Sequence, residues 1–168
     1  MSAPALTPLA AAVLEVGDPE RILEIECGDG EATLFLSREF PRARVRGVDR
    51  SQRAIREATT RVGLDPEGRV AFKQGKPGSL PFPDDHFDLV VLVDAVPAAA
   101  ETVRVLRPGG YLVLAETGRD SAPGGPRAWL GRRGLARQPL QPTKSADAGD
   151  GSFSVARLPG GGSASPAV

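Results

Sequence analysis

The sequence has few of the residues that build disulfides, metal sites or membrane spans. Its one cysteine, Cys27, excludes an internal disulfide, and its one histidine, His86, excludes a metal site made of several histidines. No stretch approaches the roughly 20 apolar residues of a membrane-spanning helix, and the chain does not start with a basic segment followed by an apolar run. These absences predict a cytoplasmic protein with no membrane partner and no bound metal.

A net charge is also missing, because 21 basic residues balance 21 acidic ones. This balance argues against a general nucleic-acid binder, which would present an excess of lysine and arginine. The two signs are unevenly placed. From residue 119 onward there are seven basic and three acidic residues, so the first 118 residues carry a formal charge of −4.

The length predicts one domain. A chain of 168 residues buries roughly 70% of its unfolded surface and holds one hydrophobic core without disulfides. Residues 159–168 consist almost entirely of glycine, serine, proline and alanine, so we expect a disordered tail there. Residues 1–158 are therefore predicted to form a single domain, with no room for a large accessory lid.

Apolar runs alternate with amphipathic segments along most of the chain. Strands are expected at residues 21–25, 45–48, 70–72, 87–93 and 111–115. Helices are expected at 9–14 with Thr7 as N-cap, at 31–39, from the N-cap Ser51 to 62, and at 98–106. A turn is expected at 108–110, a short helix at 126–130, and an antiparallel strand pair near 135–140 and 152–158 around a turn at 146–151. This order predicts an α/β, doubly wound, mostly parallel sheet with helices on both faces.

Ligands of such sheets lie at the carboxyl ends of the strands, next to the first strand. The strand exits are residues 25–30, 48–50, 74–79, 93–97 and 115–118. In the first of them, Gly28 and Gly30 allow a sharp turn and let a ligand approach the backbone without a Cβ in the way. The sequence therefore places a candidate binding site around this glycine turn.

Four segments together resemble a known family. They are Leu23-Glu-Ile-Glu-Cys-Gly-Asp-Gly30, Val48-Asp49, Leu80-Pro-Phe-Pro-Asp-Asp-His-Phe-Asp88 and Val105-Leu-Arg-Pro-Gly-Gly-Tyr111. In this order, from Arg21 to about Thr117, the chain resembles class I S-adenosylmethionine-dependent methyltransferases of the small-molecule, type 11-like kind. The resemblance implies a Rossmann-like sheet of order 3-2-1-4-5-7-6. It also implies S-adenosyl-L-methionine as cofactor and methyl transfer to a small-molecule substrate.

The resemblance also implies roles for individual residues. Asp49 would accept hydrogen bonds from the two ribose hydroxyls, and Glu24 would organise the loop around the methionine end. His86 is interpreted as a surface residue and not as a base. The predicted cofactor-binding residues are Glu24, Glu26, Cys27, Gly28, Gly30, Asp49, Arg50, Lys76, Ser79 and Leu80.

The chain departs from the family pattern at the first glycine of the motif, which is Glu26 here. A carboxylate facing the carboxylate of the ligand at about 4 Å would be repelled by about 4 kcal/mol at an effective dielectric constant of 20. A carboxylate reaching the ammonium of the ligand would instead be attracted. The sequence leaves both arrangements open.

Two further departures concern Lys76 and Asp94. Lys76 stands where the family commonly has an acid that accepts from the adenine amino group, and a lysine cannot accept a hydrogen bond. Ser79 or a backbone group is the next candidate for that contact. The segment after the strand at 87–93 is short, and Asp94 is its one ionisable side chain. Asp94 is a candidate general base or substrate contact, or else the cap of the following helix.

Two alternatives to a methyltransferase can be compared with these patterns. The first is a degenerate, non-catalytic protein of the same fold that acts as a binding or partner module, suggested by Glu26, Lys76 and the short segment after Asp94. The second is a nicotinamide-dependent dehydrogenase, which is disfavoured because Thr33 stands where Gly-x-Gly-x-x-Gly needs its third glycine. A homodimer that covers the open site is also compatible with so short a chain.

Overall fold

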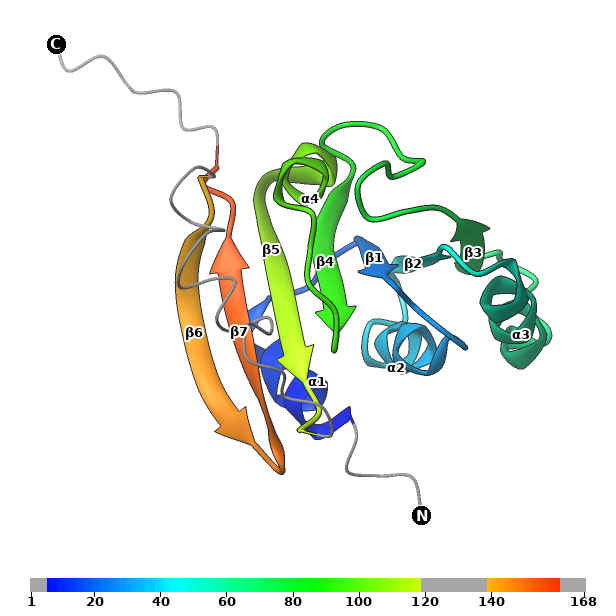
Figure 1. The fold of residues 1–168 in the computed structure, drawn as a ribbon, viewed down its shortest axis with the longest axis horizontal. Coiled ribbons are helices and arrows are strands. Elements are labelled where there is room, and N and C mark those ends of the chain that lie inside the picture. Colours follow the sequence, from blue (N-terminus) through cyan, green and yellow to red (C-terminus); the bar gives the residue numbers. More distant parts are fainter. Residues whose placement is uncertain (1–5, 119–138, 161–168) are drawn as a thin grey trace, which may run out of the picture.

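The computed structural model describes residues 6–118 and 139–160 (Figure 1). The strands in these residues are β1 (Arg21–Ile25), β2 (Arg44–Asp49), β3 (Val70–Gln74), β4 (Phe87–Val93), β5 (Leu106–Glu116), β6 (Gln141–Ala148) and β7 (Gly151–Arg157). The helices are α1 (Thr7–Ala12), the 3-10 helix η2 (Val13–Glu15), α2 (Glu31–Glu39), α3 (Gln52–Val62) and α4 (Ala99–Val105). The predicted alternation of strand and helix is confirmed.

All strands of the described residues join one sheet of order β3-β2-β1-β4-β5-β7-β6, with β3 and β6 at its two edges (Figure 1). Neighbouring strands from β3 to β5 are parallel. Strand β7 runs antiparallel to both β5 and β6, so the C-terminal hairpin closes one edge. The predicted order and the antiparallel pair are confirmed. The order reverses between β1 and β4, which places the switch point of the sheet at their carboxyl ends.

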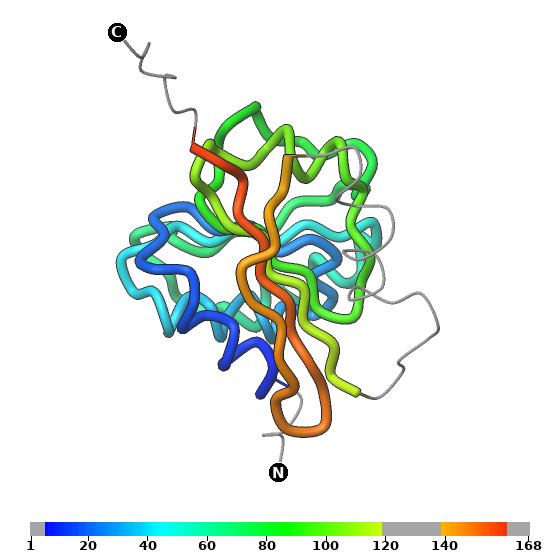
Figure 2. The backbone as a smooth tube through the Cα atoms, turned by 90° about the vertical axis from the view of Figure 1, so that its left-hand side faces the viewer, coloured from blue at the N-terminus to red at the C-terminus, as the bar shows by residue number. Residues whose placement is uncertain are grey.

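Apolar side chains form a core on each face of the sheet. One core lies under α1 and α2, where Leu36 packs in a cluster with Ile22 of β1. The other lies under α4, where Val105 and Leu80 cluster with Leu112 of β5. Helix α3 packs against β2 and β3, and Figure 2 shows α1 beside the β6–β7 hairpin. Helices therefore cover both faces, as predicted.

The start of α1 differs from the prediction. Leu6 is the N-cap, Thr7 is already helical, and no side chain caps the helix. The side chain of Thr7 lies against the turn of the β6–β7 hairpin, where a Cβ on Gly149 would be 3.2 Å from Thr7 Cγ2. The prediction of Thr7 as N-cap is wrong because a contact with a distant hairpin, which local sequence does not report, places this residue.

The predicted turn at residues 108–110 is part of β5. Gly109 N donates to the Leu158 carbonyl and Leu158 N donates to the Gly110 carbonyl, each at 2.8 Å. These bonds to the chain just after β7 pair the segment into the sheet. The Pro-Gly-Gly sequence marks a turn locally, but pairing with a remote segment decides its conformation here.

The first strand of the C-terminal pair also differs from the prediction. Strand β6 spans Gln141–Ala148, and residues 139–140, the described part of the predicted strand at 135–140, precede it outside any strand. The turn shrinks to residues 149–150. Most β6 side chains are exposed because it is the edge strand, so the apolar alternation that marks a strand is absent. Pro142 lies at a register shift with β7, and edge strands tolerate proline.

Three sequence predictions fall partly or wholly outside the described ranges. They are the helix at 126–130, most of the strand at 135–140 and most of the tail at 159–168. Within residues 6–118 and 139–160, no helix is both long enough and apolar enough to cross a membrane.

Candidate functional site

The carboxyl ends of β1, β4 and β5 border a pocket of about 300 Å³. It is lined by Leu6, Glu24, Glu26, Cys27, Gly28, Asp29, Glu31, Ala32, Val93, Asp94 and Thr117. Two hollows of about 310 and 320 Å³ lie by the opposite strand ends, and none of the predicted site residues lines them. The candidate site is therefore the pocket at the strand exits, where a doubly wound sheet binds its ligands.

The turn from β1 to α2 contains three residues in the left-handed region. Glu26, Gly28 and Gly30 have φ angles of 60°, 53° and 85°. Gly30 is the N-cap of α2, and its N–H donates to the Cys27 carbonyl at 3.0 Å. Glu26 thus adopts a left-handed conformation that glycine takes without strain, although this conformation costs a residue with a Cβ about 1–2 kcal/mol.

Asp49, at the end of β2, is bonded to the glycine turn. Its Oδ2 accepts from Gly28 N at 2.9 Å and its Oδ1 accepts from Ser51 N at 2.9 Å. Asp49 is 8% exposed. The carboxylate therefore holds the turn and the start of α3 together. The structure places it beside the site, and its predicted role as a ribose acceptor stays a prediction.

Glu24 lines the pocket although it is only 2% exposed. Thr33 Oγ1, in the first turn of α2, donates to Glu24 Oε1 at 2.5 Å. Burial raises the pKa of Glu24 to about 8, and the hydrogen bonds from Thr33 oppose this rise. Thr33 was missed as a partner, because its position one turn into a helix does not show that it faces a carboxyl group.

The raised pKa of Glu24 predicts a pH-dependent stability. The folded state holds a proton that the unfolded carboxyl group loses near its ordinary pKa of 4.5. The stabilising contribution is complete below that pH and is lost as the pH rises to about 8. Between pH 5 and 8 the free energy of unfolding should fall with rising pH because of Glu24, by up to about 1.4 kcal/mol per pH unit. We expect Glu24→Gln to remove this part of the pH dependence, as measured by urea titration at several pH values. Equal slopes in both proteins would contradict this expectation.

Glu26 forms an ion pair within the protein, and both arrangements relative to a ligand that the sequence left open stay predictions. Its Oε1 pairs with Arg50 Nε at 3.2 Å. The ion pair joins the turn after β1 to the residue after β2. The fold thus brings together two predicted cofactor-binding residues, Glu26 and Arg50. Arg50 partly neutralises the negative charge of Glu26, which stands where the family has a glycine.

Asp94 follows β4 directly and lines the same pocket. Its Oδ1 accepts from Thr117 N at 2.8 Å and its Oδ2 accepts from Thr117 Oγ1 at 2.6 Å. Asp94 does not cap α4, whose N-cap is Ala98 without a side-chain bond, so that interpretation is wrong. Its φ of 54° is left-handed, and this backbone turn directs the carboxylate to the exit of β5. Thr117 was not singled out from the sequence, although it lies at a predicted strand exit.

The residues predicted to contact adenine lie away from the pocket. Lys76 and Ser79 are exposed and form a small antiparallel bridge, with Ser79 N donating to the Lys76 carbonyl at 3.0 Å. Leu80 is buried in the core beneath α4, and its N–H donates to Glu101 Oε2 at 2.7 Å. None of the three lines the pocket around the glycine turn. Their roles as cofactor contacts stay predictions.

Arg104 of α4 fixes this loop and was not singled out from the sequence. Its guanidinium donates to the carbonyls of Leu80 and Phe82 at 2.9 and 2.8 Å. It also pairs with Glu101 at 2.7 Å and with Asp84 at 2.8 Å. These bonds hold the pKa of Arg104 above its ordinary value. Nothing local in the sequence links Arg104 to a loop about 20 residues earlier, so only the fold reveals it.

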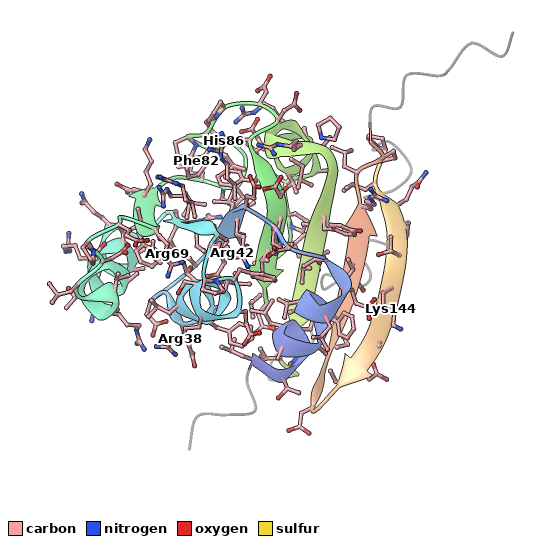
Figure 3. All side chains as sticks on the ribbon, turned by 180° about the vertical axis from the view of Figure 1, so that it is seen from behind. Arg38, Arg42, Arg69, Phe82, His86 and Lys144 are labelled. Carbon is pink, nitrogen blue, oxygen red and sulfur yellow. The ribbon has the colours of Figure 1, made fainter. Side chains whose placement is uncertain are left out.

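His86 and Cys27 have no catalytic geometry. His86 packs edge-on against Phe87 with ring centroids 4.8 Å apart, and Figure 3 shows it near Phe82, by the start of β4 and away from the strand exits. Burial and nearby arginines lower its pKa. Cys27 is buried, and desolvation together with Glu24 raises the pKa of its thiol far above the usual range. A thiol kept protonated is a poor nucleophile.

The parallel sheet with a glycine turn after β1 and an acid after β2 defines a doubly wound α/β domain of the nucleotide-cofactor-binding class. A family model described as "Methyltransferase domain" matches residues 22–110, more than half of the chain. The chain belongs to this methyltransferase domain family. The resemblance seen in the sequence is confirmed.

Similar proteins include curated methyltransferases of mycobacteria. The chain is 36% identical over 104 residues to the phthiotriol/phenolphthiotriol dimycocerosates methyltransferase 1 of Mycobacterium ulcerans, covering 58% of this chain and 37% of that protein. It is 34% identical over 130 residues to the fatty-acid O-methyltransferase of Mycolicibacterium smegmatis, covering 73% of this chain and 44% of that protein. The chain thus spans less than half the length of these relatives.

Among solved structures, the chain resembles an S-adenosylmethionine-dependent methyltransferase from Aquifex aeolicus. The TM-score is 0.74 at 20% sequence identity, over 94% of this chain and 93% of that one. At this identity the likeness shows the shared fold, and it extends over the β6–β7 edge as well as the matched family region.

Proposed function

We propose that this domain binds S-adenosyl-L-methionine at the glycine turn and transfers its methyl group to a small-molecule acceptor. The observation that carries the proposal is the 2.9 Å bond from Gly28 N to the Asp49 carboxylate. It joins the two motif segments that resemble S-adenosylmethionine-dependent enzymes, and both lie within the matched residues 22–110. The names of the mycobacterial relatives support an acceptor of small-molecule type.

The residues present fit this cofactor. A pocket of about 300 Å³ is at the lower end of the range of small-molecule sites, about 300–1,000 Å³. Glu24 and Glu26 would face the methionine end, Gly28 would allow close approach, and Asp49 with Arg50 would hold the ribose. Lys76, Ser79 and Leu80 are proposed for the adenine end, where the Arg104 contacts fix the loop.

When bound, the cofactor supplies a methyl group already activated on a sulfonium. The protein then mainly has to align the acceptor with that methyl group. We propose Asp94 as the acceptor contact or general base, because its carboxylate lines the pocket while two bonds from Thr117 hold it in place. Cys27, which also lines the pocket, would contribute shape and no nucleophile.

The domain limits and partners are proposals too. We propose one domain over residues 1–158 and a homodimer that covers the open pocket. A cytoplasmic location and the lack of a nucleic-acid partner stay predictions. Sedimentation analysis over a range of concentrations tests the homodimer, and a monomer at all of them would contradict it.

Calorimetric titration with S-adenosylhomocysteine tests the proposed cofactor. We expect one site per chain with a Kd between micromolar and sub-millimolar. No heat at millimolar ligand would contradict the proposal. A nicotinamide dinucleotide serves as control and should not bind, because the third glycine of its motif is absent. Binding of S-adenosylmethionine without turnover of any acceptor would favour the binding-module alternative.

A further inference from the structure

The charges that line the pocket are all of one sign. Among the described residues that surround it, five carry carboxyl groups and none is a lysine, arginine or histidine; these five are Glu24, Glu26, Asp29, Glu31 and Asp94. Burial raises the pKa of Glu24 to about 8, so Glu24 keeps its proton near neutral pH and adds no charge there. Two of the carboxylates have cationic partners that stand outside the pocket lining. Arg50 pairs with Glu26 at 3.2 Å, and Arg61 pairs with Asp29 at 2.8 Å.

Glu26 is the least expected of these acids. It occupies a left-handed position, with a φ of 60°, that a glycine would fill without strain. Its side chain is 26% exposed, whereas that of its partner Arg50 is 63% exposed. The carboxylate is therefore held at the pocket by the turn, and the guanidinium reaches in from solvent. An exposed pair of this kind is weak, so a ligand can displace Arg50 while Glu26 stays in place.

The two forms of the proposed cofactor differ by one charge. S-adenosylmethionine carries a sulfonium, an ammonium and a carboxylate, and so is a net cation. S-adenosylhomocysteine has a thioether in place of the sulfonium and is neutral overall. A pocket walled by carboxylates attracts the first more strongly than the second, because the Coulomb energy depends on the net charge of the ligand.

We propose that Glu26 is a specificity-determining residue that makes this site prefer the sulfonium form of the cofactor over the neutral thioether product. The inference rests on the proposed function and concerns the same pocket. Its consequence is easy release of the product, since the loss of one positive charge removes part of the attraction that held the ligand. Arg50 acts in the opposite direction, because it offsets the Glu26 charge.

Calorimetric titration with three ligands tests the proposal. They are S-adenosylmethionine, S-adenosylhomocysteine, and an amine analogue in which a protonated amino group replaces the S-methyl group. We expect the unmodified protein to bind both cations about tenfold more tightly than the thioether at 20 mM salt, with a smaller ratio at 300 mM as the charges are screened. The amine analogue separates an effect of charge from one of sulfur chemistry.

Variants of Glu26 and of Arg50 are expected to change the preference for the cationic ligands in opposite directions. Glu26→Gln and Glu26→Gly should both lower the preference for the cations about three- to tenfold, and Arg50→Gln should raise it about threefold. The glycine variant suits the left-handed turn, so it keeps the fold. Glu39→Gln is the matched control, because Glu39 ends α2 whereas Glu31 begins it at the pocket. Its ratio should equal that of the unmodified protein.

Two results would overturn the inference and one would overturn its basis. Equal affinity of the unmodified protein for S-adenosylmethionine and S-adenosylhomocysteine would remove the preference. A preference that survives Glu26→Gln unchanged would remove Glu26 as its cause. Failure of all three ligands to bind would instead contradict the proposed function, so the two failures are distinguishable.

Discussion

Replacing Asp49 with alanine is expected to weaken S-adenosylhomocysteine binding at least about a hundredfold and to lower the free energy of unfolding by about 2–4 kcal/mol. The carboxylate accepts from the backbone N–H groups of Gly28 and Ser51, each at 2.9 Å. Its removal leaves two partly buried donors without a partner and frees the turn that shapes the pocket. Calorimetry measures the first effect and urea titration the second.

Asp65 offers a matched control for this experiment. Its Oδ2 also accepts a backbone hydrogen bond, from Val70 N at 2.8 Å, but at the opposite end of the sheet, where β3 begins. Asp65→Ala should lower the melting temperature and leave the Kd for S-adenosylhomocysteine within about twofold. If Asp49→Ala bound the ligand as tightly as the unmodified protein, Asp49 would be a structural residue only.

Replacing Gly30 with alanine is expected to lower the free energy of unfolding by about 3–5 kcal/mol. Gly30 has a φ of 85°, and a Cβ there would lie 2.9 Å from the Phe72 ring and 3.0 Å from Ala58 Cβ. The new methyl group would have to push apart β3 and α3, which pack on the glycine turn. Urea titration at constant pH measures the loss.

Gly28 is the natural comparison, since it belongs to the same turn but a Cβ there would meet no other atom within 4 Å. Its φ of 53° costs alanine about 1–2 kcal/mol. Gly28→Ala should therefore keep most of the stability and lose ligand affinity, because the methyl group enters the open pocket. Similar losses of unfolding free energy in both variants would show that the clash with Phe72 does not contribute to the loss in Gly30→Ala.

Local sequence was most informative where an element is defined by its own residues. The run Arg21–Ile25 and the run Phe87–Val93 match β1 and β4, because strands buried on both faces need a nearly continuous run of apolar residues. Ser51 caps α3 as predicted and accepts from Ala54 N at 3.2 Å. A capping residue acts within one turn of helix, so its signal is complete in the local sequence.

The position of the site in the fold was predictable from the sequence, but most of the hydrogen bonds and ion pairs within it were not. The glycine turn and Asp49 come together because neighbouring parallel strands have their carboxyl ends on the same side of the sheet. The side chains that bond to the site carboxylates were not predictable. Thr33, Thr117 and Arg50 are common polar residues, and only the folded structure shows which carboxylate each one contacts. Leu80 lies in the core cluster beneath α4, and its predicted contact with the ligand stays a prediction.

The sequence by itself determined the fold class, the strand order implied by its family resemblance, and the edge of the sheet that carries the site. The fold class and the place of the site follow from the period of apolar residues and from glycines at strand exits, which are local properties of the chain, whereas the strand order was implied by the family resemblance alone. Tertiary structure alone decided that Thr7 packs on a hairpin, that residues 108–110 join β5, and that Glu26 pairs with Arg50. Each of these depends on a contact with residues far away in the sequence, and a local sequence pattern does not contain the geometry of a long-range contact.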